Sequence, residues 1–379
     1  MRTARTFLVL IALLSSVVVG GVVTASSASA HEEREAGFPD GTGVVPTYLG
    51  LSNARYRVVC TSASASKIAA MPTGTLKVRN QQLLAKCRYE SIQDAINSIT
   101  QPKTSVYVLP GTYTESKYAA IKPEGYCANI KTESKDPLQL AQFIGSITGL
   151  QTESASSPIA LSYPDQVRCP HNLNLIALLG DSTPQDDSIR CDNATCGTQI
   201  VGTGSKPSDV VIDNRFSKLN AIRADRAGGV VMRNFTVQQA EFNAVYVLET
   251  DGFLIDELVA RGNDEYGILA FASDHGLIQN VDAYYNGDSG IYPGSASDLN
   301  ADSKTTAVSR YAIEIRNSKS HDNTLGYSGT AGNSVYAHHN QFYDNATGIA
   351  TDSLFPGHPG LPQDHARWSH NEVFSNNSN

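Results

Sequence analysis

Charged and aromatic residues recur at fixed places before a repeated asparagine in the second half of the chain. Each asparagine shortly precedes a Gly-Ile or Gly-Tyr pair, and the copies are 23, 37 and 22 residues apart: Asn263, Asn286, Asn323 and Asn345. The residues two places before them are Arg261, Tyr284, His321 and Tyr343. The residues four places before them are Val259, Asp282, Lys319 and Gln341. Imidazole and phenol groups can act as general acids and bases, and cationic groups can stabilise negative charge that forms during proton transfer.

These residue types suit the abstraction of a proton next to a carboxylate, the step shared by lyases and C5-epimerases of uronate polymers. That step needs a base close to the carbon and a cation that neutralises the neighbouring acid. Lys319 or Arg261 is predicted to neutralise the carboxylate. His321 or a tyrosine, Tyr284 or Tyr343, is predicted to act as the base, and the other tyrosine to donate a proton. The predicted partner is therefore an extracellular polysaccharide.

Two other functions use the same residue types. A glycoside hydrolase needs two carboxyl groups across the scissile bond, and Asp282, Asp288 and Asp322 are available, but the sequence singles out no pair. A non-catalytic carbohydrate-binding or cell-surface module needs only spaced aromatic and polar groups. His321, Lys319 and the tyrosines are equally compatible with an ordinary solvated surface.

The segments around the asparagines predict short β-strands. Apolar and β-branched residues alternate with a period of about two in residues 230–237, 244–248, 277–281 and 312–316. No segment between them is long enough for a crossover helix, and Gly and Asn supply tight corners. A repeat of this length cannot bury its apolar face alone, so neighbouring repeats must stack. The sequence therefore predicts an all-β, single-stranded parallel β-helix, with regular coils over residues 172–379.

The register of these strands separates structural from functional positions. Each repeated asparagine is predicted to hydrogen-bond to its equivalents on neighbouring coils and to satisfy buried turn amides. Because side chains alternate between the two faces of a strand, the residues three places before the asparagines should point inward: Ala260, Ala283, Ser320 and Phe342. The residues on either side should point outward. The predicted site is the resulting exposed strip, which consists of Arg261, Asp282, Tyr284, Lys319, His321 and Tyr343.

Two insertions interrupt the repeat, at residues 295–310 and 353–365. Both follow a Gly-Ile strand, so they are predicted to stand side by side at one corner and to form a cleft beside the strip. The residues predicted to contact substrate are Asp282 of the strip and, near the insertions, Tyr292, His358, Asp364 and His365. A metal site in the second insertion, and calcium bound by Asp264 or Asp288, are alternatives to ordinary polar turns.

The first 30 residues have the pattern of a secretory signal. Arg2 and Arg5 precede an apolar run, and the small residues Ala28-Ser29-Ala30 follow it. The mature chain is then predicted to be secreted and to have no membrane partner; a retained membrane anchor is the alternative.

All six cysteines precede the regular coils, and their even number in an exported chain predicts disulfides: Cys60, Cys87, Cys127, Cys169, Cys191 and Cys196. The spacing leaves their connectivity open, although the short loop from Cys191 to Cys196 favours a local pair. A zinc site is the competing interpretation.

Upstream of the coils, the sequence predicts an arm over residues 31–88, a helix over 90–99 and an irregular insertion over 114–170. The helix has its apolar residues on one face and Ser91 as a candidate N-cap. The phrases Ser91-Ile-Gln-Asp-Ala-Ile96 and Val106-Tyr-Val-Leu-Pro-Gly-Thr-Tyr113 resemble the pectin lyase-like superfamily of right-handed β-helices. The resemblance implies a right-handed β-helix over residues 89–379 with this helix covering its open end. It implies no particular reaction, because the superfamily hosts several.

Two further phrases, Gly287-Asp-Ser-Gly-Ile-Tyr292 and His358-Pro-Gly-Leu-Pro-Gln-Asp364, resemble a group of exported β-helix proteins and imply no reaction either. The net charge of −8 argues against a nucleic-acid partner, because phosphate binding requires clustered Lys and Arg. The final residues, 375–379, stop in the middle of a coil, which favours a fragment of a longer product.

Overall fold

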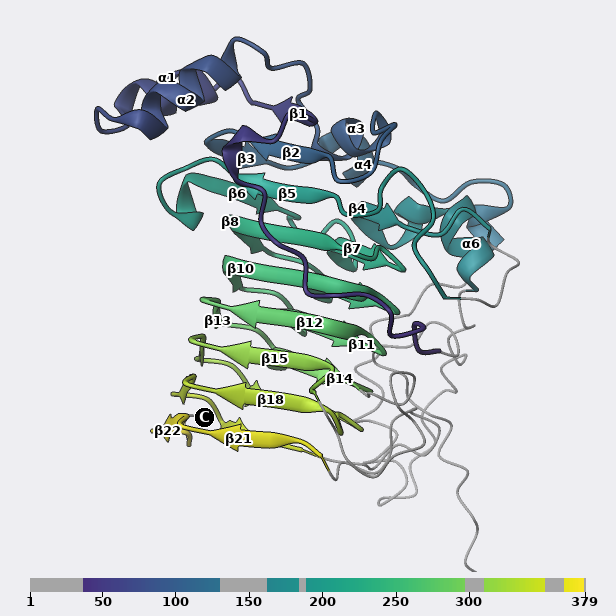
Figure 1. The fold of residues 1–379 in the computed structure, drawn as a ribbon, viewed down its shortest axis with the longest axis vertical. Coiled ribbons are helices and arrows are strands. Elements are labelled where there is room, and N and C mark those ends of the chain that lie inside the picture. Colours follow the sequence, from purple (N-terminus) through teal and green to yellow (C-terminus); the bar gives the residue numbers. More distant parts are fainter. Residues whose placement is uncertain (1–36, 130–161, 184–188, 297–309, 352–364, 378–379) are drawn as a thin grey trace, which may run out of the picture.

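The chain winds into a stack of coils whose strands form two sheets (Figure 1). The computed structural model describes residues 37–129, 162–183, 189–296, 310–351 and 365–377. One sheet has 15 strands and the other has seven. Neighbouring strands are parallel, as in the pairs β8 with β10, β10 with β12 and β11 with β14. The predicted all-β parallel β-helix is therefore confirmed.

Each regular coil contains a first strand (called the long strand below), a bend, a second strand (called the short strand) and a returning strand of the second sheet, and β8 and β10 each run through both of the first two positions. The long strands are β1 (Tyr56–Val59), β2 (Ser105–Val108), β5 (Gln199–Gly202), β8 (Val230–Gln238), β10 (Asp251–Arg261), β12 (Asp274–Gln279), β15 (Ile313–Arg316), β18 (Val335–His338) and β21 (Arg367–Ser369). The short strands are β3 (Gly111–Tyr113), β6 (Val210–Asp213), β13 (Asp282–Tyr284), β16 (Lys319–His321), β19 (Gln341–Tyr343) and β22 (Glu372–Phe374). The returning strands are β4 (Asn174–Leu179), β7 (Asn220–Asp225), β9 (Asn243–Leu248), β11 (Ile268–Phe271), β14 (Ser289–Gly294), β17 (Leu325–Tyr327) and β20 (Thr347–Ile349).

Helices occur in the N-terminal part of the described chain. The α-helices are α1 (Ser64–Ala70), α2 (Thr75–Leu84), α3 (Ile92–Asn97), α4 (Ser116–Ala119) and α6 (Tyr163–Arg168). The short 3-10 turns are η1 (Gly50–Ser52), η2 (Cys127–Asn129), η3 (Pro170–Asn172) and η4 (Pro207–Asp209). α3 lies within the predicted range 90–99, and the hydroxyl of Ser91 caps it by accepting a hydrogen bond from the Asp94 amide at 3.0 Å. Its buried residues join the core of the first coils, so it covers the end of the solenoid.

The β-helix begins earlier than residue 89. β1 pairs with β2 in register from Tyr56 with Ser105, so a coil strand lies inside the arm predicted over residues 31–88. The same arm contains α1 and α2. The sequence did not predict these two helices, because each has a single buried apolar residue and so no apolar stripe. These residues are Ile68 in α1 and Leu83 in α2.

The asparagine ladder joins successive coils through side-chain amides. The Nδ2 of Asn263 donates to Oδ1 of Asn286 at 2.8 Å, and the same bond links Asn286 to Asn323 at 2.9 Å and Asn323 to Asn345 at 3.1 Å. Asn345 continues the ladder to Asn376, 31 residues further along the chain. All but Asn376 are buried, so each amide satisfies groups that water does not reach. The predicted structural role of these asparagines is confirmed.

Residues 37–55 form a strap that runs in an extended path across the outer face of the larger sheet (Figure 1). The amide of Gly43 donates to Oδ2 of Asp251 at 2.7 Å, and the amide of Leu49 donates to Oε1 of Gln199 at 3.0 Å. Tyr48 packs on outward-facing apolar side chains of three long strands, namely Val231, Leu254 and Leu277. The strap therefore replaces water over the apolar part of this face.

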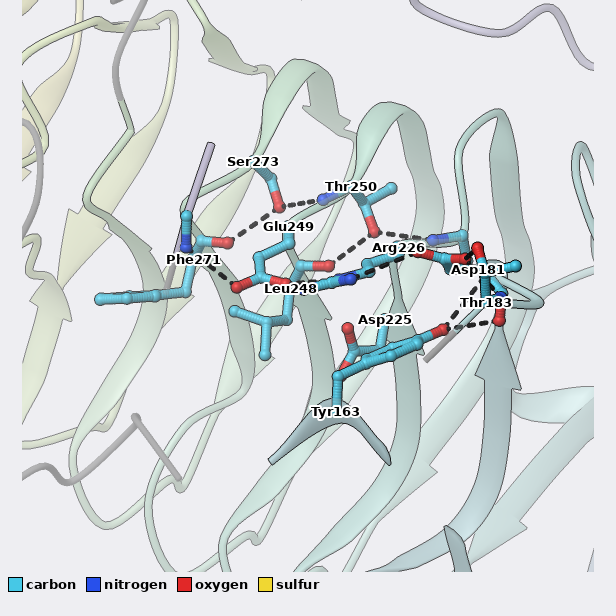
Figure 2. A network of polar contacts seen from close by, with 12 residues as sticks. Tyr163, Asp181, Thr183, Asp225, Arg226, Leu248, Glu249, Thr250, Phe271 and Ser273 are labelled. Carbon is cyan, nitrogen blue, oxygen red and sulfur yellow. Dashed lines mark hydrogen bonds and ion pairs between the residues drawn. The ribbon is translucent and has the colours of Figure 1, made fainter. Parts of the chain in front are cut away.

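A buried ionic network ties the start of the strap to the returning strands (Figure 2). The guanidinium of Arg226 lies 2.8 Å from Glu249 and 3.2 Å from Asp181. Glu249 also accepts a hydrogen bond from the Gly37 amide at 3.0 Å. Tyr163 of α6 lies beneath the guanidinium, 4.2 Å from ring centroid to guanidinium carbon. One cation thus holds two carboxylates, an inserted helix and the strap together.

All six cysteines are paired, as predicted: Cys60 with Cys87, Cys127 with Cys169, and Cys191 with Cys196. The third pair is the local one that the spacing favoured. The zinc interpretation is therefore wrong. Most of the insertion predicted over residues 114–170 lies outside the described residues.

Candidate functional site

The strip predicted from the register lies along the outward face of β10, β13, β16 and β19. Arg261 pairs with Tyr284, Tyr284 with His321, and His321 with Tyr343, so these four side chains form one column. Asp282 and Lys319 are register partners in the adjacent column. The four residues predicted to point inward, Ala260, Ala283, Ser320 and Phe342, are fully buried. The structure thus brings the six strip residues together on one face.

The rings of the strip stack on one another. Tyr284 and His321 have centroids 5.1 Å apart and an interplanar angle of 11°, and His321 and Tyr343 are 4.7 Å apart at 10°. Tyr343 in turn stacks on Phe374 at 5.1 Å and 5°. Because neighbouring rings cover each other's faces, the strip presents ring edges rather than faces. A sugar would meet ring edges and tyrosine hydroxyl groups here, not an open aromatic platform.

His321 is held between two carboxylates. Its Nε2 lies 3.0 Å from Oδ1 of Asp282, and its Nδ1 lies 2.6 Å from Oδ2 of Asp322. A carboxylate accepts hydrogen bonds, so both contacts are satisfied together only when both ring nitrogens carry a proton. A doubly protonated imidazole has no lone pair for a substrate proton. The geometry therefore does not fit the predicted role of His321 as a base.

Tyr343 fits the role of proton donor. Burial, together with the nearby carboxylates of Asp282, Asp322 and Asp344, raises the pKa of the Tyr343 hydroxyl. The raised pKa keeps the phenol protonated at neutral pH and opposes action as a base, but it also makes Tyr343 a weaker acid than an ordinary tyrosine.

The two cations of the strip differ in what they contact. Arg261 donates from Nη1 to the hydroxyl of Tyr284 at 3.1 Å and from Nε to Oε1 of Gln238 at 3.1 Å. Lys319 is exposed, and within the described part of the chain its ammonium forms no ion pair. Lys319 is therefore the cation of the strip that is best placed to meet an anionic ligand.

Residues 297–309 and 352–364, which make up nearly all of the two insertions, lie outside the described residues. The strip comes before each returning strand and the insertions come after it, so β14 separates Tyr284 from the first insertion. Figure 1 accordingly shows β13 and β22 at one edge of the stack and β14 toward the other. The described residues that begin the first insertion therefore lie at the opposite end of β14 from the asparagine corner, and the cleft beside the strip stays a prediction.

Of the residues predicted to contact substrate near the insertions, Tyr292 is buried away from the strip. Tyr292 is 4% exposed, and its hydroxyl accepts a hydrogen bond from the Thr330 amide at 3.2 Å. It packs in an apolar cluster on the second sheet, so a polymer cannot reach it. His365 is half-buried at the end of the second insertion. His358 and Asp364 lie outside the described residues.

One group of described residues has the composition of a metal site. Asp251, Asp274 and His275 offer ligand atoms within 4.8 Å of one another at the start of β10 and β12. Nδ1 of His275 lies 2.7 Å from Oδ1 of Asp251, and Arg310 contacts both carboxylate oxygens of Asp274 at 2.5 and 2.8 Å. Arg310 and His275 therefore already occupy the carboxylates as an ion-pair cluster.

Asp288, one of the two predicted calcium ligands, is bonded within the protein. Its Oδ1 accepts from the Ser289 hydroxyl at 2.6 Å, and Oδ2 lies 3.5 Å from the Tyr266 hydroxyl. Burial raises the pKa of the Asp288 carboxyl. Asp264, the other predicted ligand, is an exposed turn residue.

Replacing Asp288 by asparagine should make the protein at least as stable at pH 7. Because the pKa of Asp288 is raised on folding, its contribution is favourable below the ordinary value of 3.8 and is lost as the pH rises through the folded pKa. Asparagine does not ionise, so the advantage of Asp288→Asn should vanish in acid. Urea denaturation of both proteins from pH 3 to pH 7 measures this difference. Lower stability of the variant at pH 7, or calcium stabilising the natural protein alone, would contradict it.

A second polar cluster, beside the strip, was not predicted. It consists of Glu314, Arg316, Tyr336, His338 and His339, from β15, β18 and the bend that follows β18. Counting in steps of two from the asparagines fails here, because the bend residue has a positive φ and shifts the alternation by one position. His339, with φ of 55°, is such a residue. If the alternation is counted afresh from the residue before the bend, Arg316 and His338 fall in one outward column.

Comparison with known families decides the handedness of the coil. Residues 200–354 match the family model described as "Right handed beta helix region". The chain is a right-handed β-helix protein. The right-handed β-helix fold that the resemblance implies is thereby confirmed.

Solved structures with the same kind of fold are distant in sequence from this β-helix protein. Pectate lyase Pel9A is 12% identical with a TM-score of 0.41, and the alignment covers 81% of this chain and 58% of that chain. The A-module of the Azotobacter vinelandii mannuronan C-5 epimerase AlgE4 is 14% identical with a TM-score of 0.30, covering 76% and 84%. The AlgE6 A-module is 15% identical with a TM-score of 0.29, covering 47% and 52%. The β-helix protein thus spans little more than half of two of these three structures. A search of curated proteins gave no match.

Among the residues that the structure describes, no helix is long and apolar enough to cross a membrane.

Proposed function

We propose that this β-helix protein is exported and acts on a uronate-containing polysaccharide as a lyase or C5-epimerase. The observation that carries the proposal is that Lys319, an exposed cation, and Tyr343, a phenol with a proton to donate, lie on one face of adjacent coils. Lys319 meets the sugar carboxylate and Tyr343 supplies a proton. The paired cysteines and the signal-like N-terminus support export.

The reaction removes the proton at C5 of a uronate while Lys319 neutralises its carboxylate, so that the electron pair is stabilised as an enolate. In a lyase, the C4–O bond then breaks and the leaving oxygen takes a proton from Tyr343. In an epimerase, Tyr343 returns a proton to C5 from the opposite side. Both routes need a base, and the occupied nitrogens of His321 do not provide one.

The lack of a base in the strip favours one alternative, a non-catalytic carbohydrate-binding or cell-surface module. Such a module needs the exposed Lys319 and the polar edges of the stacked rings, but no base. The other alternative, a glycoside hydrolase, has less support. The ring of His321 fills the space between Asp282 and Asp322, where a hydrolase holds its substrate and water.

Replacing Lys319 by methionine should weaken the action on uronate polymers at least tenfold, because a charge-assisted contact contributes roughly 1.5–3 kcal/mol. The assay incubates the protein with a panel of uronate polymers. It follows absorbance from new unsaturated ends and deuterium exchange at C5. The matched control is Lys67→Met, an exposed lysine on α1 at the opposite end of the stack.

Turnover by the natural protein and by Lys67→Met, but not by Lys319→Met, would support the enzyme. Binding of a uronate polymer without turnover would support the binding module instead. If no uronate polymer binds, the proposed lyase or epimerase function is wrong.

A further inference from the structure

Three side chains of the second polar cluster form a hydrogen-bonded chain that ends at the surface. Nε2 of His338 lies 2.9 Å from Oε1 of Glu314, and Nδ1 of His338 lies 2.7 Å from Nδ1 of His339. Glu314 sits on β15, His338 ends β18 in the next coil, and His339 occupies the bend. His338 is largely shielded, with 14% of its side chain exposed, whereas His339 is exposed.

Neighbouring groups fix the orientation of the first two members. The ring of Tyr336 stacks on His338 with centroids 4.2 Å apart and an interplanar angle of 22°. Nη1 of Arg316 donates to the same oxygen of Glu314 at 2.8 Å. His338 therefore has little freedom to turn away from either partner.

When His338 is neutral, the contacts fix which ring nitrogens carry protons. The carboxylate of Glu314 accepts, so Nε2 of His338 carries the proton between them. Nδ1 of a neutral His338 is then an acceptor, and the proton of that contact belongs to Nδ1 of His339. This tautomer leaves Nε2 of His339 with a lone pair on an exposed ring. A carboxylate that fixes the tautomer of a histidine is a known way to make that histidine an effective base.

We propose that Glu314, His338 and His339 form a proton relay in which Nε2 of His339 is the general base of the reaction. The inference rests on the proposed function for its substrate, a uronate polymer. It supplies the base that the strip lacks.

The proton transfers balance within the relay. Nε2 of His339 takes the C5 proton, and the electron pair of the C–H bond stays on the substrate as the enolate. The Nδ1 proton of His339 passes to Nδ1 of His338. His338 is then a cation next to the carboxylate of Glu314, and His339 is neutral with its proton on Nε2. The positive charge thus forms beside a carboxylate that already faces it, which lowers the cost of proton uptake.

The relay is close to the strip. His339 stands two residues before Gln341, and Gln341 is the register partner of Lys319. From strand dimensions, the Cα atoms of His339 and Lys319 are on the order of 8 Å apart. Both side chains are exposed, so a base and a cation can act on the same sugar residue.

The next coil provides a matched control. His370 occupies the same bend and stacks on His339 with centroids 5.0 Å apart at 4°, but the relay does not run through it. His339 and His370 have φ of 55° and 53°, and the preceding bends hold Asn280 and Asn317 at 53° and 51°. Asparagine therefore suits this backbone, and either histidine can be replaced by it without new strain.

His339→Asn should lower kcat on the uronate polymer by at least about a hundredfold, the usual contribution of a general base, and His370→Asn should leave it within a few fold. Equal kcat for His339→Asn and the natural protein would overturn the assignment of the base. Unchanged circular dichroism spectra show that both variants are folded.

A measurement without substrate tests the relay itself. Nitrogen NMR shifts of the histidine side chains should show His339 with its proton on Nδ1 in the natural protein. In His338→Gln, that tautomer should give way to the commoner form with the proton on Nε2. A proton on Nε2 of His339 in both proteins would overturn the relay. An intact relay in a protein that turns over no uronate polymer would overturn the proposed function while supporting the geometry inferred here.

Discussion

Replacing Arg226 by methionine is expected to lower the free energy of unfolding by about 3–5 kcal/mol, the usual cost of removing one partner from a buried ionic group. The guanidinium is 9% exposed, and the carboxylates of Asp181 and Glu249 around it are 0% and 1% exposed. Without Arg226, two negative charges would remain in a space closed to water. Methionine fills a similar volume, so the loss would come from the uncompensated charges rather than from a cavity.

Arg215→Met is the matched control for this prediction. Arg215 also has a positive φ and also faces a carboxylate, Asp213, at 3.8 Å, but its side chain is 67% exposed. An exposed pair of this kind contributes about 0–1 kcal/mol. Urea denaturation at pH 7 should therefore separate the two variants by several kcal/mol. Similar losses for both would mean that water reaches the Arg226 network.

Removing the Cys127–Cys169 disulfide should cost about 4 kcal/mol, and removing Cys191–Cys196 about 2 kcal/mol, because a cross-link restricts the unfolded chain more when it closes a longer loop. The two pairs are 42 and 5 residues apart in sequence. The longer loop joins η2 to the end of α6, and α6 carries the tyrosine beneath Arg226. Its loss would therefore also loosen the helix from the ionic network.

The comparison uses two double variants, Cys127→Ser with Cys169→Ser and Cys191→Ser with Cys196→Ser. The free energy of unfolding of each is measured under non-reducing conditions against the natural protein. An equal cost for the two pairs, or a larger cost for the short loop, would show that native contacts rather than loop length determine the contribution of these disulfides.

Much of the fold follows from the sequence because its determinants are local and repeated. The spacing of Asn263, Asn286 and Asn323 defines one coil per repeat, and hydrogen bonds between their side chains are what require it. Ser91 marks the start of the capping helix for an equally local reason. α1 and α2 escaped prediction because their burial depends on contacts of single residues such as Leu83 with the first coil.

The strip was predictable for the same reason, since Tyr284, His321 and Tyr343 keep a fixed offset from the ladder. The chemistry of the strip was not. The offset gives the face of a side chain, but not the carboxylates that close on both nitrogens of His321. The bend residue with positive φ reverses the inward–outward alternation of the side chains. The cluster around His338, which precedes the bend, was therefore not predicted. Tyr292 was misplaced because an outward side chain of the second sheet is covered by other parts of the chain.

The strap changes how this stack can come apart. In a simple solenoid each coil contacts only its neighbours, so the stack can open from an end, one coil at a time. Here the strap bonds Gly43 to Asp251 across 208 residues and Gly37 to Glu249 across 212. The coils between β2 and β10 are therefore closed into one cooperative unit that must release the strap before any of them separates. The coils from β15 onward lie beyond those anchors. They carry the relay and three residues of the strip, Lys319, His321 and Tyr343, and they can open without disturbing the coils that the strap holds.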